Sequence, residues 1–117
     1  MIQTDILIIG AGPCGLFTVF EAGLLKLRCH LIDALPQAGG QCAEIYPKKP
    51  IYDIPAYPSI LAGDLVDQLM EQAEPFKPEW QMNFPCRGGR NARKENSCKK
   101  KHQNVKSCLI AMANAIW

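Results

Sequence analysis

Three glycines near the start of the chain, at the spacing G-x-G-x-x-G, are the residues that point most clearly to chemistry. They are Gly10, Gly12 and Gly15. In a dinucleotide site the first glycine of this pattern allows a tight turn, the second leaves room for a pyrophosphate, and the third lets a helix lie close to a sheet. Asp33 follows Gly10 by 23 residues, and an acidic side chain at this spacing can accept hydrogen bonds from a ribose hydroxyl. The pattern predicts a dinucleotide site, with an ordinary glycine turn as the alternative.

The residues around these glycines predict the β-α-β unit that a dinucleotide site requires. Residues 4–9 form an apolar run typical of a strand buried on both faces. Pro13 suits the first position of a helix, where its missing N–H does no harm, and residues 28–33 predict a second strand that ends in an acid. The free N–H groups of the first helical turn, including that of Cys14, would face a pyrophosphate. The apolar side of this helix is expected to consist of Leu16, Val19, Phe20 and Leu24.

The next stretch, residues 35–60, is rich in Pro, Gly and Tyr. These residues disfavour a helix or a central strand, so we expect an extended loop that crosses the nucleotide cleft. Residues 60–73 predict a second helix, with an apolar face of Leu61, Leu65, Leu69 and Ala73 and a polar face of Asp64, Asp67, Gln68 and Glu71. Up to this point the choice between NAD and FAD stays open, because both cofactors use the same fingerprint.

An ordered set of short motifs follows the glycines: Gly-Gly-Gln at 39–41, Tyr46-Pro47, Ile51-Tyr52-Asp53-Ile54, Asp64-Leu65-Val66, Leu69-Met70-Glu71-Gln72-Ala73 and Pro75-Phe76. With these motifs the chain resembles the FAD domain of the bacterial ferredoxin (flavodoxin)–NADP⁺ reductases of the thioredoxin-reductase-like type. The resemblance covers residues 1 to about 80. It implies FAD as the cofactor, NADPH as the co-substrate, ferredoxin or flavodoxin as the partner, and a homodimer.

The resemblance also implies which residues contact FAD. The loop after the first strand would hold the cofactor and Asp33 its adenosine ribose, while Gln41 and Tyr46 would contact it closer to the flavin. A glutamine amide can both donate and accept hydrogen bonds, and a tyrosine offers a flat apolar face with a polar tip. Without the family, a turn residue and a core aromatic would be the plainer interpretations. The complete set of expected contacts is Gly10, Gly12, Pro13, Cys14, Gly15, Asp33, Gly40, Gln41 and Tyr46.

The length of 117 residues, with 48% hydrophobic and 21% charged residues, suits at most one ordinary globular domain. The reductases carry two nucleotide-binding domains, and this chain would supply only the first piece of the FAD domain, without the NADPH domain. We see no leader sequence and no apolar run of about 18 residues. We therefore expect a cytoplasmic protein that does not enter a membrane.

The charge balance changes sharply near residue 80. Residues 1–80 contain five Lys or Arg against ten Asp or Glu, whereas residues 81–117 contain eight against one. Residues 86–108 show neither strand alternation nor a helical stripe, so we expect a disordered basic tail over 81–117, such as a shifted reading frame would produce. One alternative is a basic arm for nucleic acid, disfavoured because no aromatic side chains stand between the basic residues. The other is a zinc site, whose ligands would lack a close C-x2-C pair: Cys86, Cys98, His102 and Cys108.

The cysteines and histidines of the first 80 residues suggest no catalytic residue and no metal site. Cys14, Cys29 and Cys42 include no C-x-x-C pair, so a redox-active disulfide of the thioredoxin reductase kind is not expected in this piece. Such cysteine usage fits a reducing compartment. His30 lies inside an apolar strand and is expected in the core.

Together these features predict an α/β fold, a truncated Rossmann-type FAD/NAD(P)-binding half-domain with three layers around a parallel sheet, over residues 1–80. The expected function is that of the FAD-binding portion of an oxidoreductase that moves electrons between NADPH and ferredoxin or flavodoxin. Whether the truncated chain is active by itself stays open. The alternatives are a non-enzymatic dinucleotide-binding module and a basic nucleic-acid-interacting protein.

Overall fold

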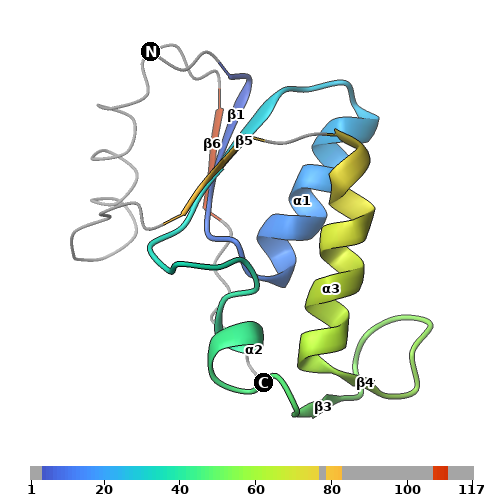
Figure 1. Cartoon of the computed structure of the whole chain (residues 1–117). Helices are drawn as coiled ribbons and strands as arrows, with labels where there is room; N and C mark the ends of the chain where they lie inside the picture. Colours follow the sequence, from blue (N-terminus) through green and yellow to red (C-terminus); the bar gives the residue numbers. More distant parts are fainter. Residues whose placement is uncertain (1–3, 77–78, 83–106, 111–117) are drawn as a thin grey trace.

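A four-stranded parallel sheet is at the centre of the fold (Figure 1). The computed structural model describes residues 4–76, 79–82 and 107–110, and the strand order within them is β5-β2-β1-β6. The strands are β1 (Ile6–Ile9), β2 (Cys29–Ile32), β5 (Glu79–Gln81) and β6 (Ser107–Ile110). Both predicted N-terminal strands are confirmed, each slightly shorter than expected.

Strand β1 lies between β2 and β6 and is buried. Leu7 and Ile8 have no exposed surface and Ile9 is 7% exposed, as expected for a parallel strand that is covered on both faces. The pairing of β1 with β2 is parallel and in register along both strands. The carboxyl ends of the two strands therefore meet at one edge of the sheet, and Gly10 and Asp33 follow directly from them.

Helix α1 (Pro13–Leu24) connects β1 to β2 and packs against both. It begins with a proline, as predicted, and ends in a Schellman motif. In this motif the N–H of Leu27 donates to the C=O of Ala22 at 2.9 Å. The N–H of Lys26 donates to the C=O of Gly23 at the same distance, and Lys26 has a left-handed φ of 58°.

The predicted apolar side of α1 is only partly confirmed. Leu16 and Val19 are fully buried, but Leu24 is 56% exposed, so its predicted place on this side is wrong. The reason is the helical repeat of 3.6 residues, which brings Ala22 rather than Leu24 to the buried face after Val19. Phe20 is half-buried at the edge of this face.

The second helix, α3 (Ala62–Ala73), starts two residues later than predicted. The residues before it form β4 (Ile60–Leu61), which pairs antiparallel with β3 (Pro50–Ile51). The expected loop also contains the short helix α2 (Gln41–Glu44), and a 3-10 turn, η1 (Glu74–Phe76), follows α3. Leu61 is 41% exposed and lies outside the expected apolar face. The polar face is confirmed, since Asp64, Asp67, Gln68 and Glu71 are all exposed.

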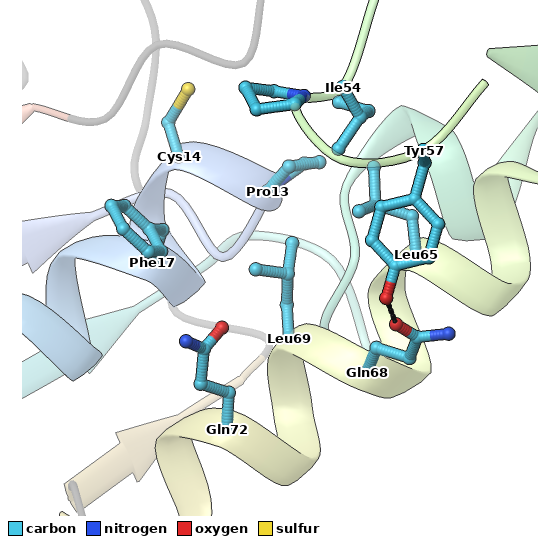
Figure 2. A pocket seen from close by; sticks show the side chains of 10 residues that line it. Pro13, Cys14, Phe17, Ile54, Tyr57, Leu65, Gln68, Leu69 and Gln72 are labelled. Carbon is cyan, nitrogen blue, oxygen red and sulfur yellow. Dashed lines mark hydrogen bonds between the residues drawn. The ribbon is translucent and has the colours of Figure 1, made fainter. Parts of the chain in front are cut away.

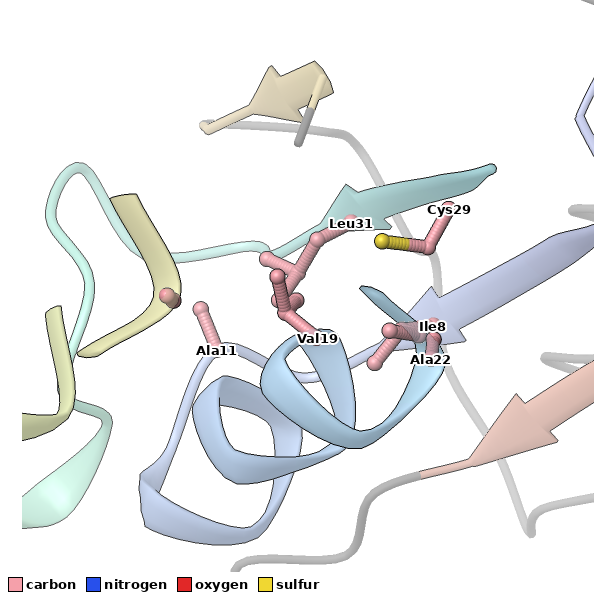
Figure 3. Close-up of a cluster of buried hydrophobic side chains, with 7 residues drawn as sticks. Ile8, Ala11, Val19, Ala22, Cys29 and Leu31 are labelled. Carbon is pink, nitrogen blue, oxygen red and sulfur yellow. The ribbon is translucent and has the colours of Figure 1, made fainter. Parts of the chain in front are cut away.

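Two groups of buried side chains hold these elements together. Helices α1 and α3 lie side by side on one face of the sheet (Figure 1). The first group joins them to β1 and β2 (Figure 3) and consists of Ile8, Ala11, Val19, Ala22, Cys29, Leu31 and Ala73. The second group joins α1, α2, β3, β4 and α3 and consists of Leu16, Cys42, Ile51, Ile60, Ala62, Leu65 and Val66. Because full burial of one large apolar side chain contributes about 1.5–3 kcal/mol, these groups fix the segment between β1 and α1. Within the described ranges, no helix is long and apolar enough to cross a membrane.

Strand β6 lies in the segment that the sequence suggested to be disordered. Ser107 to Ile110 pair in parallel with β1 along its whole length, so the expectation of disorder is wrong for these four residues. The segment that shows no alternation, residues 86–108, shares only Ser107 and Cys108 with this strand, so the missing alternation says little about β6. Strand β5 also crosses the predicted boundary between residues 80 and 81. Residues 83–106 and 111–117 of the basic tail, including the candidate zinc ligands Cys86, Cys98 and His102, lie outside the described residues.

Candidate functional site

The glycine turn joins the end of β1 to the start of α1. Gly10 has a φ of 111°, which a residue with a side chain rarely adopts, and its N–H donates to the C=O of Ile32 at 2.9 Å. Gly12 is extended, with φ −74° and ψ −177°, so its lack of a side chain matters for space rather than for backbone conformation. Gly15 is buried on the inner face of α1. Gly10 thus has the backbone conformation that the fingerprint predicts for its first glycine, while the roles of Gly12 and Gly15 stay predictions.

The start of α1 presents backbone N–H groups that are not used by the helix itself. The C=O of Gly12 accepts the N–H of Leu16 at 3.0 Å, so the N–H groups of Cys14 and Gly15 precede the first intrahelical bond. No side chain caps this end of α1. Such groups, together with the positive end of the helix dipole, favour an anion.

The carboxylate of Asp33 lies against the glycine turn. Its Oδ2 atom accepts a hydrogen bond from the N–H of Ala11 at 2.6 Å, and its Oδ1 atom accepts one from the N–H of Leu35 at 2.8 Å. The backbone N–H of Asp33 donates to the C=O of Gln81 in β5 at 3.1 Å. Each carboxylate oxygen can accept more than one hydrogen bond, so the group can also accept a ribose hydroxyl. The structure thus brings the predicted acid and the predicted glycines together.

The Gly39-Gly40 pair is the third part of the site. Both glycines are buried and have positive φ, 113° and 58°, and the N–H of Gly39 donates to the C=O of Ala11 at 2.7 Å. Helix α2 starts directly after Gly40. The backbone of Gly40 and Gln41 is therefore held close to the glycine turn.

Tyr46 lies beyond α2 and is half-buried. The Nζ atom of Lys49 is 5.2 Å from the centre of its ring, within the range of a cation–π interaction. The N–H of Lys49 also donates to the C=O of Tyr46 at 3.0 Å, which closes the turn. The structure thus gives Tyr46 a local packing role, and its contact with a cofactor stays a prediction.

A cavity of about 450 Å³ opens beside the start of α1 (Figure 2). It lies between α1, the turn at 54–57 and α3, and this size falls in the range of small-molecule pockets. Its walls are mainly apolar, with Gln68, Gln72 and the hydroxyl of Tyr57 as polar groups; the hydroxyl donates to Oε1 of Gln68. The apolar lining residues are Pro13, Phe17, Ile54, Pro55, Leu65 and Leu69, with Cys14 also lining the cavity.

Sequence reasoning missed this cavity, although one signal for it was present. Residues 54–57 read Ile-Pro-Ala-Tyr, and the N–H of Tyr57 donates to the C=O of Ile54 at 3.1 Å. Ala56 has a left-handed φ of 69°. Proline at the second position and positive φ at the third are typical of a type II turn, in which glycine normally occupies the place of Ala56.

The described cysteines and His30 lie in different surroundings near the site. Burial raises the pKa of the Cys42 thiol, and the charge of Lys49 partly offsets this shift. Burial likewise raises the pKa of Cys29, while Cys14 is exposed. His30 is only 3% exposed, as the sequence predicted, with Nδ1 3.2 Å from Oε2 of Glu79. In the part of the chain that the structure describes, no group of three His, Cys, Asp or Glu side chains could hold a metal ion.

A parallel sheet with a glycine turn that leads into a helix, and an acid at the end of the neighbouring strand, defines a dinucleotide-binding Rossmann fold. Residues 8–71 match the family model described as an NAD(P)-binding Rossmann-like domain, and the chain belongs to this family. The predicted fold class is thereby confirmed.

The relatives of the chain include ferredoxin–NADP reductases. Ferredoxin–NADP reductase 2 of Christiangramia forsetii is 85% identical over 78 residues, which is 67% of this chain and 22% of the relative. The ferredoxin–NADP reductase of Flavobacterium psychrophilum is 71% identical over 83 residues, 71% of this chain and 24% of the relative. The chain thus spans about a quarter of the length of the relatives it matches. The thioredoxin reductase of Streptococcus pyogenes is 29% identical, with a TM-score of 0.59 over 68% of this chain and 25% of that one. The resemblance inferred from the motifs is confirmed over the first 80 residues.

Proposed function

We propose that the chain is the FAD-binding portion of a flavoprotein oxidoreductase that moves electrons between NADPH and ferredoxin or flavodoxin. The observation that carries this proposal is the 2.6 Å contact of Asp33 with the peptide N–H of Ala11. It places the acid that would bind a ribose directly beside the turn that would bind a pyrophosphate. The names and identities of the relatives support the reaction assigned to the complete enzyme.

The pyrophosphate of FAD would bind at the start of α1. The N–H groups of Cys14 and Gly15 would donate to its oxygens, and the absence of a side chain at Gly12 leaves the approach open. The helix dipole adds about 0.3–1 kcal/mol for a negative group at an exposed helix start. This part of the site would bind the pyrophosphate that all dinucleotides share, so it would not discriminate between FAD, NAD and NADPH.

The adenosine end supplies the selectivity that we propose. Asp33 would accept the ribose hydroxyls of FAD, as acids at this position do in dinucleotide-binding folds. A 2′-phosphate, as in NADPH, would bring a second negative charge to this carboxylate. Sites that accept a 2′-phosphate use an arginine instead. We therefore assign FAD to this site and NADPH to another part of the complete enzyme.

The remaining contacts follow the family. Gln41 and Tyr46 would contact the cofactor closer to the flavin, and Gly40 lets the chain pass close to it. FAD supplies the chemistry of accepting a hydride and releasing single electrons, while the protein holds and orients the cofactor. We propose no general acid or base from this chain. By the same family argument we propose a homodimer in the cytoplasm.

A fluorescence titration with FAD tests the proposal. The parent chain should quench FAD fluorescence with saturation and should bind NADPH more weakly. Gly12→Glu adds a carboxylate at the pyrophosphate position and should weaken FAD binding roughly a hundredfold, or about 2.7 kcal/mol.

The matched control is Ser59→Glu, which adds the same charge at an exposed position. This variant should bind FAD like the parent chain. Equal FAD affinity for Gly12→Glu and the parent would overturn the proposal. Tighter binding of NADPH than of FAD by the parent would overturn the assignment of the cofactor.

A further inference from the structure

We propose that Asp33 is a positioning residue for the glycine turn, in addition to any contact it makes with a ribose. Its carboxylate would hold the peptide of Ala11 in the conformation that opens the turn to a pyrophosphate, before any ligand is present. This inference rests on the proposed function, because the turn that Asp33 would position is the one proposed to bind the pyrophosphate. The geometry behind it consists of hydrogen bonds within the chain itself.

The peptide groups of Ala11 are held from two sides. Its N–H donates to Oδ2 of Asp33 at 2.6 Å, and its C=O accepts the N–H of Gly39 at 2.7 Å. The side chain of Ala11 is fully buried in the group of apolar residues shown in Figure 3. The middle residue of the glycine turn is therefore fixed by two hydrogen bonds and by packing.

Asp33 itself is fixed by its own backbone and by its second oxygen. Its N–H donates to the C=O of Gln81 in β5, and Oδ1 accepts the N–H of Leu35. The carboxylate is thus aimed at Ala11 by contacts with Leu35 and Gln81 of the chain itself. A hydrogen bond to an ionised acceptor is also stronger than one between neutral groups, so the carboxylate suits this task better than an amide would.

Gly39 provides the opposite half of this arrangement. Its φ of 113° is strained for any residue with a side chain. A Cβ atom built there would lie 2.5 Å from Cβ of Ala43 and 2.9 Å from Cγ1 of Val66, closer than real Cβ contacts. Only glycine can therefore bring its N–H to Ala11 at this point. The first glycine of the Gly-Gly pair thereby gains a role that the sequence motifs did not assign.

The two roles of Asp33 predict different results with a ligand that lacks ribose hydroxyls. ADP carries the pyrophosphate and adenosine of FAD, and 2′,3′-dideoxy-ADP carries the same groups without the two hydroxyls. If Asp33 acts only on the ribose, Asp33→Asn should weaken the binding of ADP and leave the affinity for 2′,3′-dideoxy-ADP unchanged. If Asp33 also positions the turn, Asp33→Asn should weaken the binding of both ligands, each roughly tenfold or more.

A second measurement needs no ligand and separates this inference from the proposed function. Amide hydrogen exchange of the full chain should show Ala11 and Leu35 exchanging about tenfold faster or more in Asp33→Asn and Asp33→Ala than in the parent. The amides of Leu7 and Ile8 in β1 should keep their parent rates, since a loss of overall stability would accelerate them as well. Asp53→Asn removes an exposed carboxylate and is the matched control.

Unchanged exchange at Ala11 in both Asp33 variants would overturn the inference, even if FAD binds as proposed. The bond can also be observed in the parent chain, by the scalar coupling across it between the Ala11 nitrogen and the Asp33 carboxyl carbon. A detectable coupling supports the inference, and its absence in an otherwise assigned spectrum would overturn it whether or not the variants fold. Failure of FAD binding alone would overturn the proposed function and leave this result standing.

Discussion

Replacing Gly23 by alanine should destabilise the fold, although alanine is the better helix former. Gly23 lies in the last turn of α1, and Phe76 of η1 packs against it. A Cβ atom at this position would lie 2.1, 2.2 and 2.7 Å from the Cγ, Cδ1 and Cδ2 atoms of Phe76. The Phe76 ring would have to move, and it packs edge-to-face on Phe20 with the ring centres 5.7 Å apart.

The balance of three terms gives the size of the effect. Gly23→Ala gains about 1 kcal/mol of helix propensity. Overpacking a close contact costs about 1–3 kcal/mol, and disturbing the aromatic pair of Phe20 and Phe76 costs about 0.5–1.5 kcal/mol more. The expected net loss is about 0.5–3.5 kcal/mol of the free energy of unfolding.

Phe76→Ala supplies the background in which the sign should reverse. With the ring removed, Gly23→Ala keeps its propensity gain and should stabilise the chain by up to about 1 kcal/mol. Urea unfolding of the parent, both single variants and the double variant, followed by far-ultraviolet circular dichroism, measures the four free energies. Stabilisation by Gly23→Ala in the parent background would refute the close packing of η1 on α1.

Three further predictions follow from the structure. Lys26→Gly should stabilise the chain by about 1 kcal/mol in the same unfolding assay, because glycine adopts the left-handed φ of 58° without strain. Burial raises the pKa values of the Cys29 and Cys42 thiols, so the folded state favours their neutral form. The free energy of unfolding should therefore be unaffected by these thiols below about pH 8.5 and should fall as the pH rises above it. At pH 8, a thiol reagent should label Cys14 quickly and the other two only on unfolding. The 117 residues carry one dinucleotide fingerprint, whereas hydride transfer needs a second bound dinucleotide with its nicotinamide about 3–3.5 Å from the flavin. With FAD supplied, this chain should therefore oxidise NADPH more than tenfold more slowly than a full-length relative. Comparable rates would contradict this prediction.

The elements around the glycine turn were predictable from local patterns. Gly10 requires a positive φ and Pro13 starts a helix, and both properties depend only on the residue itself and its nearest neighbours. The buried runs that form β1 and β2 were visible for the same reason. The spacing of Asp33 from Gly10 predicted that the acid would reach the turn, because parallel strands bring their carboxyl ends to one edge.

Features that depend on contacts distant in sequence could not be predicted. Strand β6 is stabilised by pairing with β1, about 100 residues away in the chain, and the basic stretch that precedes it in the sequence favoured disorder. The cavity requires the 54–57 turn to fold over α1 and α3, and Ala56 occupies a position where a motif search expects glycine. The hydrogen bond from Ala11 to Asp33 also needs the orientation of a side chain, which no pattern of residue types specifies.

Whether FAD binds with its pyrophosphate at the start of α1 can be decided by one amide titration. The full chain, labelled with nitrogen-15, is titrated with FAD while the amide chemical shifts are followed. We predict saturable changes that are largest at Gly12, Cys14 and Gly15, with smaller changes at Leu35 near the ribose. Changes confined to residues remote from α1 and β2, or no saturable change with FAD at any amide, would contradict a dinucleotide site at this turn.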